Sequence, residues 1–323
     1  MKSIIFSFAL SLIFCLAITP FFIPFLRRLK FGQSIREEGP SWHRVKSGTP
    51  TMGGIAFIIA SLLASLIVML VFHGIRYELL IPMLTAFAYG GVGFWDDYIK
   101  VIKKRNLGLS AKQKFLAQFL VALVSTLSMH YFGYLTGDLV IPFVKNTVDI
   151  GLWNIPLTVL VQLSVVNSVN LTDGLDGLAA SVTLVVSLFF VLCAYLLKST
   201  SGIFIAAISG GCLGFLVFNA HPAKLFMGDT GSLYLGGAIA VTASMLNLPL
   251  ILIIVGGVYL IETLSVILQV ASFKLTGKRI FKMSPIHHHF EMSGFSETKI
   301  VLLFSVTSLI LCMLGYFCIH TIF

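Results

Sequence analysis

The stretch "SIIFSFALSLIFCLAITPFFIPF" (residues 3–25) contains no charged residue, and as a helix it is long enough to cross the apolar part of a bilayer. It is too long for the core of a signal peptide and lacks a clear small-residue cleavage site, so we predict a retained membrane helix. Similar apolar runs recur along the 323 residues, of which 57% are hydrophobic and only 11% are charged. Soluble domains contain about 25% charged residues. The sequence therefore predicts an all-α polytopic membrane protein.

The apolar runs predict about ten transmembrane helices in a single membrane domain that spans residues 1–323. Because this count is even, both termini are expected on the same side of the membrane. The connecting segment 133–151 is the longest on that side, and we expect a small hairpin in it. The predicted helices cover residues 3–26, 51–72, 78–95, 115–132, 152–169, 178–197, 203–219, 233–247, 250–270 and 300–322.

Lysine and arginine are distributed unevenly between the two sets of loops. One set holds 18 of the 22 basic residues, and the rest of the chain holds only Lys2, Arg76, Lys145 and Lys198. The positive-inside rule places the basic set in the cytoplasm and both termini in the periplasm. The net charge of +9 also favours contact with anionic lipid or an anionic substrate. The predicted cytoplasmic loops are 27–50, 96–114, 170–177, 220–232 and 271–299.

Carboxylates gather on the same predicted side, in three glycine-flanked segments. These are "GFWDDYIK" (93–100), "VNSVNLTDGLDGLAA" (166–180) and "FNAHPAKLFMGDTGSLYLGG" (218–237). A lone Asp at a helix end is usually a cap or a solvated charge. Several crowded carboxylates at a lipid boundary repel one another, so a cation is expected to share their site. The segments contribute Asp96, Asp97, Asn167, Asn170, Asp173, Asp176, Asn219 and Asp229, and we predict an active site on the cytoplasmic face.

The residue types around these carboxylates indicate the kind of cation and ligand. All five cysteines lie in apolar stretches without metal-ligand spacing, so the oxygen ligands favour Mg²⁺ or Mn²⁺ over zinc. Basic and hydroxyl side chains at helix ends are often only topology anchors. As a set around a carboxylate–metal centre they would neutralise a diphosphate. The candidates are Lys46, Thr51, Lys112 and Lys114.

Together with "SPIHHHFE" (284–291), these motifs resemble the bacterial phospho-N-acetylmuramoyl-pentapeptide-transferases, also called translocase I. That family belongs to the polyprenyl-phosphate N-acetylhexosamine-1-phosphate transferase superfamily, and the resemblance covers essentially the whole chain. It implies transfer of phospho-MurNAc-pentapeptide from UDP-MurNAc-pentapeptide to undecaprenyl phosphate, giving lipid I and UMP with Mg²⁺ as cofactor. This is the first membrane step of peptidoglycan synthesis. The resemblance also implies a bacterial inner-membrane location, contact with membrane lipid, a homodimer and no nucleic-acid partner.

The resemblance also implies roles for individual residues. Asp229 is expected to be the main Mg²⁺ ligand with Asp173 beside it, Asp96 to deprotonate or orient the acceptor phosphate, and Asp97 to support the metal or that base. Direct attack by the lipid phosphate and a covalent aspartyl-phosphate intermediate are both possible mechanisms. Direct attack is favoured because a phosphate is already a competent anionic nucleophile. Expected substrate contacts are Lys46, Thr51, Lys112, Lys114, Asn167, Asn170, Asp173, Asp176, Asn219, Phe226, Gln269, His287, His288 and His289.

Two alternative functions belong to different classes. A sister transferase would use UDP-GlcNAc, but "HHHFE" is the mark of the muramoyl-pentapeptide branch. A transporter would place acidic residues near the bilayer midplane on broken helices, whereas here they cluster at one face. Glu262, inside a predicted helix, is either a functional intramembrane acid or a hydrogen-bonded carboxylate that faces the bundle.

The three consecutive histidines lie in the last basic loop, where we expect a short amphipathic helix. Adjacent side chains diverge, so His287, His288 and His289 are poorly placed to bind one zinc ion. A purely solvated loop is one reading. The favoured reading is a loop folded over the carboxylates, in which His287 or His288 bonds a phosphate or a sugar hydroxyl.

Overall fold

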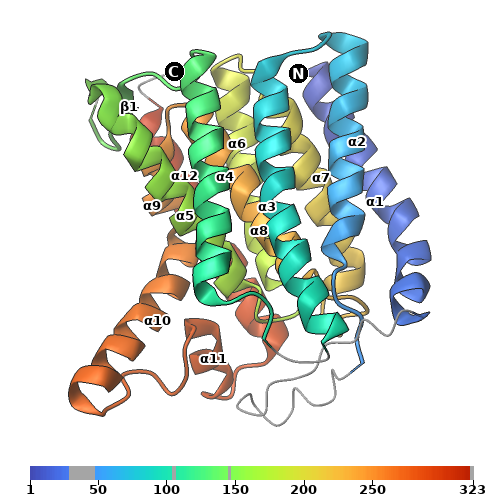
Figure 1. The fold of residues 1–323 in the computed structure, drawn as a ribbon, viewed down its shortest axis with the longest axis vertical. Coiled ribbons are helices and arrows are strands. Elements are labelled where there is room, and N and C mark those ends of the chain that lie inside the picture. The colour runs from blue at the N-terminus through green and yellow to red at the C-terminus, as the bar shows by residue number, and fades with distance from the viewer. Residues whose placement is uncertain (29–47, 104–106, 145–146, 321–323) are drawn as a thin grey trace.

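The computed structural model describes residues 1–28, 48–103, 107–144 and 147–320, and its helices form one bundle (Figure 1). A two-stranded antiparallel hairpin pairs β1 (Asp138–Val140) with β2 (Thr147–Asp149), which confirms the predicted hairpin in an otherwise all-α chain. Short 3-10 turns, η2 (Gly151–Trp153) and η3 (Pro249–Ile251), precede α5 and α9. The helices are α1 (Lys2–Arg28), α2 (Gly54–Phe72), α3 (Tyr77–Ile102), α4 (Ala111–Tyr131), α5 (Asn154–Thr172), α6 (Leu178–Leu196), α7 (Gly202–Asn219), α8 (Gly228–Met245), α9 (Leu252–Val255), α10 (Gly257–Thr276), α11 (Ile286–Glu291) and α12 (Glu297–Ile319).

Eight helices in the described part of the chain are long and apolar enough to cross a membrane, which confirms a polytopic architecture. The predicted spans at α4 and α8 are not among these eight. Helix α8 is less apolar than these eight, and every residue from Thr230 to Met245 is buried by protein. A helix that is covered on all sides by neighbouring helices contacts little lipid, so it tolerates the glycine, serine and threonine found in α8.

The helix α8 forms the centre of the bundle and packs against α3 and α5, while α7 packs against α1 and α6. The close approach of α3 to α8 depends on Gly93. A Cβ at this position would collide with the backbone of Asp229 and Thr230. The absence of a side chain therefore lets the two backbones meet where the predicted carboxylates lie.

The predicted single helix over 250–270 is wrong, because this region consists of η3, α9 and α10. The break falls at Gly256, directly before Gly257, and paired glycines are a common cause of helix kinks. Beyond the break, α10 leans away from the bundle, as Figure 1 shows. The two termini lie at one end of the bundle and α11 lies at the other.

The predicted boundaries around the carboxylates also change. The helix predicted to end at residue 95 continues to Ile102, so Asp96 and Asp97 are helical rather than part of a loop. Lys100 pairs with Asp96 one turn away and so offsets its charge within the helix. The helix predicted to begin at residue 233 begins at Gly228, which places Asp229 in its first turn.

Candidate active site

Three carboxylates from two helices form the centre of the site. Asp96, Asp97 and Asp229 each offer one oxygen atom, and these oxygens lie within 4.8 Å of one another. Asp96 and Asp97 are only 3% and 4% exposed. Three negative charges at this separation, two of them buried, repel strongly, so the arrangement is stable only with cations beside it. We call these three residues the carboxylate centre.

Two lysines supply positive charge to the carboxylate centre. The Nζ atom of Lys100 lies 2.6 Å from Asp96 Oδ2 and 2.7 Å from Asp229 Oδ2. The Nζ atom of Lys114, from α4, lies 2.9 Å from Asp229 Oδ2. Lys114 was predicted, whereas Lys100 was missed. Its position four residues after Asp96 on a helix was the signal that could have identified it.

Lys112, which was predicted together with Lys114 as a phosphate contact, does not reach the carboxylate centre. It is exposed, and no ion pair joins it to a described residue. Residues two apart on a helix point in different directions. Only one lysine of this pair can therefore face the carboxylates.

Asn170, near the end of α5, orients Asp229 from a third helix. Its Nδ2 donates to Asp229 Oδ1 at 2.7 Å and to Ser232 Oγ at 2.8 Å, and its Oδ1 accepts from Lys114 at 3.3 Å. Asn167, one turn earlier, instead donates to Gln118 Oε1 at 2.8 Å. The two asparagines therefore have different surroundings, and Asn170 is the one at the centre.

The start of α8 is held in place by Asp97 and by the segment before α2. Asp97 Oδ2 accepts from the backbone N–H and the hydroxyl of Thr230, at 2.9 and 2.7 Å. Gly228 has a φ of +71°, and a Cβ there would lie 3.0 Å from Thr51 Oγ1. Thr51 thus stands beside the first turn of α8. Lys46, its predicted companion, lies outside the described residues.

Asp173 occupies the turn after α5 and is half-buried. Burial raises the pKa of its carboxyl group well above the usual value, and the charges of Asp229, Asp97 and Asp176 raise it further. Asp173 is not among the carboxylates that meet in the centre. Its predicted role as a second metal ligand stays a prediction.

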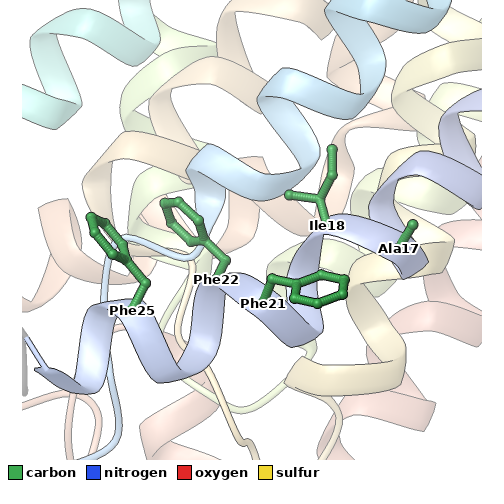
Figure 2. A pocket seen from close by; sticks show the side chains of 5 residues that line it. All are labelled: Ala17, Ile18, Phe21, Phe22 and Phe25. Carbon is green, nitrogen blue, oxygen red and sulfur yellow. The ribbon is translucent and has the colours of Figure 1, made fainter.

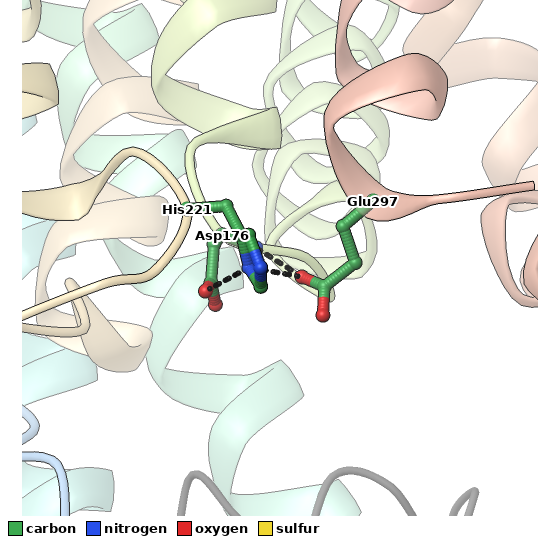
Figure 3. Close-up of side chains that lie close together, drawn as sticks. All are labelled: Asp176, His221 and Glu297. Atoms are coloured by element: carbon green, nitrogen blue, oxygen red, sulfur yellow. Dashed lines mark hydrogen bonds and ion pairs between the residues drawn. The ribbon is translucent and has the colours of Figure 1, made fainter.

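Asp176 belongs to a second polar cluster. Its Oδ2 lies 3.0 Å from His221 Nδ1, and the same nitrogen lies 3.7 Å from Glu297 Oε2. Figure 3 shows the imidazole between the two carboxylates. His221 and Glu297 were not predicted, because they lie far from Asp176 in sequence and only the fold brings them together. Asp176 therefore connects the α5–α6 turn to the loop after α7 and to α12.

Asn219 and Phe226 shape the loop between α7 and α8. Asn219 Oδ1 accepts from Gly177 N at 3.1 Å, and its Nδ2 donates to Leu225 O at 2.8 Å. The backbone of Phe226 bonds Pro50 O at 2.9 Å and Gly53 N at 2.8 Å, and its ring is half-buried. Asn219 ends α7, and Phe226 lies in the loop that leads into Asp229.

The histidine triplet forms half of the short helix α11, where each imidazole has a different partner. His287 is buried, and its Nδ1 lies 3.0 and 3.1 Å from the two oxygens of Glu262. His288 Nδ1 lies 2.7 Å from Glu291 Oε2, and His289 Nδ1 accepts from Lys282 N at 3.1 Å. Among the described residues, no metal-type group includes these histidines. Glu262 is thus a hydrogen-bonded carboxylate, and its partner lies on α11.

Gln269 stabilises the segment that leads into α11. Its Oε1 accepts from Ile280 N at 2.9 Å and Phe281 N at 3.0 Å, and its Nε2 donates to Phe281 O at 2.9 Å. These bonds use both polar atoms of the amide. In this structure, Gln269 therefore positions the chain before the histidines.

The donor chemistry of the carboxylate centre fits a magnesium ion. Asp96, Asp97 and Asp229 offer only oxygen ligands, which Mg²⁺ prefers. Lys100 and Lys114 contact one oxygen of Asp229, and Asn170 contacts the other. The positive charges of Lys100 and Lys114 thus already stabilise Asp229 in this site.

Comparison with known proteins agrees with this geometry. The profile of glycosyl transferase family 4 matches residues 79–247, and phospho-N-acetylmuramoyl-pentapeptide-transferase signature 1 matches residues 46–58. A phospho-N-acetylmuramoyl-pentapeptide-transferase of Thermoanaerobacter sp. (strain X514) is 50% identical over 98% of this chain and 99% of its own length. Those of Acetivibrio thermocellus and Bacillus licheniformis are each 49% identical, over 98% and 97% of this chain and 95% and 97% of their own. The chain belongs to the phospho-N-acetylmuramoyl-pentapeptide-transferase family.

The residues of the site lie within the segments that these family models match. Residues 79–247 include all three carboxylates and both lysines. Residues 46–58 include Thr51 and also Gly53 and Gly54, whose N–H groups donate to the carbonyls of Phe226 and Met227. Gly53 and Gly54 of the signature segment thus bond the residues directly before α8.

A hollow on the outer face of α1 has different chemistry. It measures about 620 Å³ and is lined by Ala17, Ile18, Phe21, Phe22 and Phe25, which Figure 2 shows along one helix. Phe21 and Phe25 are 80% and 52% exposed. Such apolar exposure on a membrane helix is expected where lipid is the solvent. This hollow is suited to acyl chains and not to a nucleotide.

Proposed function

We propose that this family member transfers phospho-MurNAc-pentapeptide from UDP-MurNAc-pentapeptide to undecaprenyl phosphate, giving lipid I and UMP. An oxygen of the lipid phosphate attacks the phosphorus that bears the sugar. The bond from this phosphorus to the bridging oxygen breaks, and UMP leaves with the electron pair. The observation that carries the proposal is the carboxylate centre, which combines three carboxylates with Lys100 and Lys114 in a chain of this family. Phosphoryl transfer depends mainly on positioning and charge neutralisation.

The physical nature of the two substrates fixes where the reaction must occur. One substrate is held in the bilayer and the other is dissolved in water, so the centre must lie at a membrane face. We place it at the cytoplasmic face of a bacterial inner membrane, with ten spans and both termini in the periplasm. The basic loops support this orientation. A homodimer is expected from the family resemblance.

The lysines and Asp96 act on the phosphates in this proposal. Lys100 and Lys114 contact Asp229 through a single oxygen, so the lysines are placed to share their donors with a diphosphate. A phosphate monoester has a second pKa of about 6, so the acceptor is largely a dianion near neutral pH. Asp96 therefore needs to orient the acceptor more than to remove a proton. This favours direct attack over a covalent aspartyl-phosphate.

Asp229 is the proposed main ligand of Mg²⁺, with Asp96 and Asp97 beside it and Asp173 as a further ligand. A bound Mg²⁺ would neutralise charge on the transferring phosphoryl group. Asn170 holds Asp229 Oδ1 and thereby fixes the direction of its carboxylate. Removal of Asn170 would leave this carboxylate with one fewer orienting donor.

The nucleotide and sugar are assigned to the loops around the centre. Phe226 is the proposed stacking partner of uracil, because its half-buried ring lies in the loop directly before Asp229. Asn219 and Asp176 hold that loop in place. The further proposed contacts to nucleotide, diphosphate or sugar are Lys46, Thr51, Lys112, Asn167, Asn170, Asp173, His288 and His289. Gln269 and His287, whose polar atoms contact protein, are proposed to act by positioning the histidine segment.

Product analysis tests this proposal. Purified protein would be mixed with undecaprenyl phosphate, UDP-MurNAc-pentapeptide and Mg²⁺, and the products would be identified by mass spectrometry. Lipid I and UMP in equal amounts are expected. A matched reaction with UDP-GlcNAc should give no lipid product. Transfer from UDP-GlcNAc alone would overturn the substrate assignment and support the sister transferase.

A further inference from the structure

The pair formed by Glu262 and His287 is buried between a membrane helix and the histidine helix. Glu262 on α10 is 0% exposed, and His287 on α11 is 1% exposed. Both carboxylate oxygens of Glu262 lie within 3.1 Å of His287 Nδ1. Both oxygens of this carboxylate can therefore accept a hydrogen bond from the same ring nitrogen. The contact joins residues 25 apart in sequence and fixes where α11 lies against α10.

The other ring nitrogen of His287 faces the substrate turn. Its Nε2 is buried and has no hydrogen-bond partner among the described residues. A Cβ added to Gly174 would overlap Nε2 and would stand only 2.6 Å from Cε1. The hydrogen that replaces the side chain of Gly174 therefore points at this edge of the ring. Gly174 directly follows Asp173, so the imidazole packs on the turn between α5 and α6.

These two contacts select one tautomer of the imidazole. A carboxylate accepts hydrogen bonds, so a proton on Nδ1 is favoured beside Glu262. A proton on Nε2 would point at the C–H of Gly174, whereas a bare lone pair there accepts a weak C–H contact. Both ends of the ring therefore favour a proton on Nδ1 and none on Nε2.

We propose that Glu262 is a positioning residue that acts through His287. It holds the imidazole in the Nδ1-protonated tautomer, and the bare Nε2 edge keeps α11 packed on the Gly174 turn. This fixes the histidine segment over the α5–α6 turn, which carries Asp173 and Asp176. The consequence for catalysis rests on the proposed function, in which that turn binds the nucleotide sugar. Gly174 is required because any larger side chain would displace the ring.

The isosteric substitution Glu262→Gln tests the tautomer directly. Because both oxygens contact Nδ1, the amide of Glu262→Gln presents one acceptor and one N–H donor to this nitrogen, so the preference for a proton on Nδ1 is weakened. The signals of His287 can be assigned in ¹⁵N spectra of histidine-labelled protein in detergent, because they are lost in His287→Gln. In the wild-type protein these signals should show a protonated Nδ1 and a bare Nε2. In Glu262→Gln a second set of signals, with the proton on Nε2, should appear. A wild-type proton on Nε2, or no change in the variant, would overturn the proposal.

Kinetics separate positioning from a general loss of structure. Glu262→Gln should raise the KM for UDP-MurNAc-pentapeptide about tenfold, with a smaller change in kcat. The control is Glu78→Gln, which also removes a bonded carboxylate but at the opposite end of the bundle, where Glu78 accepts from Ser199 and Thr200. This control should leave KM unchanged. Equal effects of the two variants on KM would refute a positioning role for Glu262.

A double-mutant cycle tests the contact with Gly174. Gly174→Ala should lower the melting temperature in the wild-type background, because the new methyl group meets the imidazole. In a His287→Ala background the same change should have little effect. Equal losses in both backgrounds would overturn the contact. The spectra and melting temperatures need no substrate, so failure of the proposed function would leave these two results standing.

Discussion

Asp97 on α3 accepts two hydrogen bonds from Thr230 in the first turn of α8, across 133 residues of sequence. Its neighbour Asp96 faces elsewhere, accepting from Leu109 N at 2.8 Å and pairing with Lys100 at 2.6 Å. Consecutive residues on a helix point about 100° apart, so the closest partners of the two aspartates differ, although Lys100 Nζ also lies 3.7 Å from Asp97 Oδ1. Asp97 positions the turn that carries Asp229, and Asp96 remains at the lysine side of the centre.

This division predicts that Thr230→Val reproduces part of the effect of losing Asp97. The substitution removes one donor to a buried carboxylate, and we expect a loss of about 1–3 kcal/mol in stability and about tenfold in kcat. Thr230→Ser retains the hydroxyl group and serves as the control. Melting temperature in detergent and steady-state kinetics measure the two effects. Unchanged values in Thr230→Val would show that Asp97 does not act through this contact.

Removing the charge of Asp229 or of Asp96 is expected to abolish transfer. Asp229→Asn and Asp96→Asn keep the shape of each side chain but weaken its interactions with the lysines and with a cation. We expect losses of about 10³-fold or more in kcat, the scale of losing one strong electrostatic contact in a transition state. Size-exclusion chromatography in detergent checks that the variants remain folded. Full activity in either variant would refute the role of that residue.

Lys100 is expected to be essential, although the sequence reading did not single it out. Lys100→Met removes the charge that contacts both Asp96 and Asp229, so we expect a loss of about 10²-fold or more in kcat. Lys103, three residues later, is exposed and caps the same helix. Lys103→Met is therefore the matched control and should change kcat by less than about twofold. Similar losses in both variants would mean that only general surface charge matters.

Chelation of the metal should stop the reaction. Three carboxylates within 4.8 Å repel less when a divalent cation lies among them, and the proposed transfer needs the same charge on the phosphates. Addition of EDTA should reduce the rate to background, and Mg²⁺ should restore it. The production of UMP over time is the measurement. A rate that is independent of metal would contradict the magnesium assignment.

The raised pKa of Asp173 predicts a pH-dependent gain in stability for Asp173→Asn. Burial is the largest cause of the rise of this pKa from its usual value of 3.8. The charges of Asp229, Asp97 and Asp176 raise it further. Because the folded protein binds this proton more tightly than the unfolded chain, stability falls as pH rises from about 4 toward the raised pKa. In EDTA, Asp173→Asn should therefore melt higher than wild type at pH 7. The difference should shrink near pH 4, and a gap that does not vary with pH would contradict the shift.

The sequence by itself determined the architecture, because that depends on local quantities. The length and apolarity of runs such as residues 3–25 determine that helices form, since backbone groups in lipid must be bonded within the segment. The spacing of the three histidines already disfavoured a shared zinc ion. The positions of Asp173 and Asp229 near helix ends were likewise predicted, since each is local to its motif, whereas Asp96 lies within α3.

Only the tertiary structure decided which of these side chains meet. The backbone contact at Gly93 brings α3 against α8, and this contact places Lys100 between Asp96 and Asp229. Asp176 likewise meets His221 across 45 residues of sequence. These outcomes depend on which helix faces approach closely across long sequence separations. Composition and periodicity describe one helix at a time, so they do not determine such contacts.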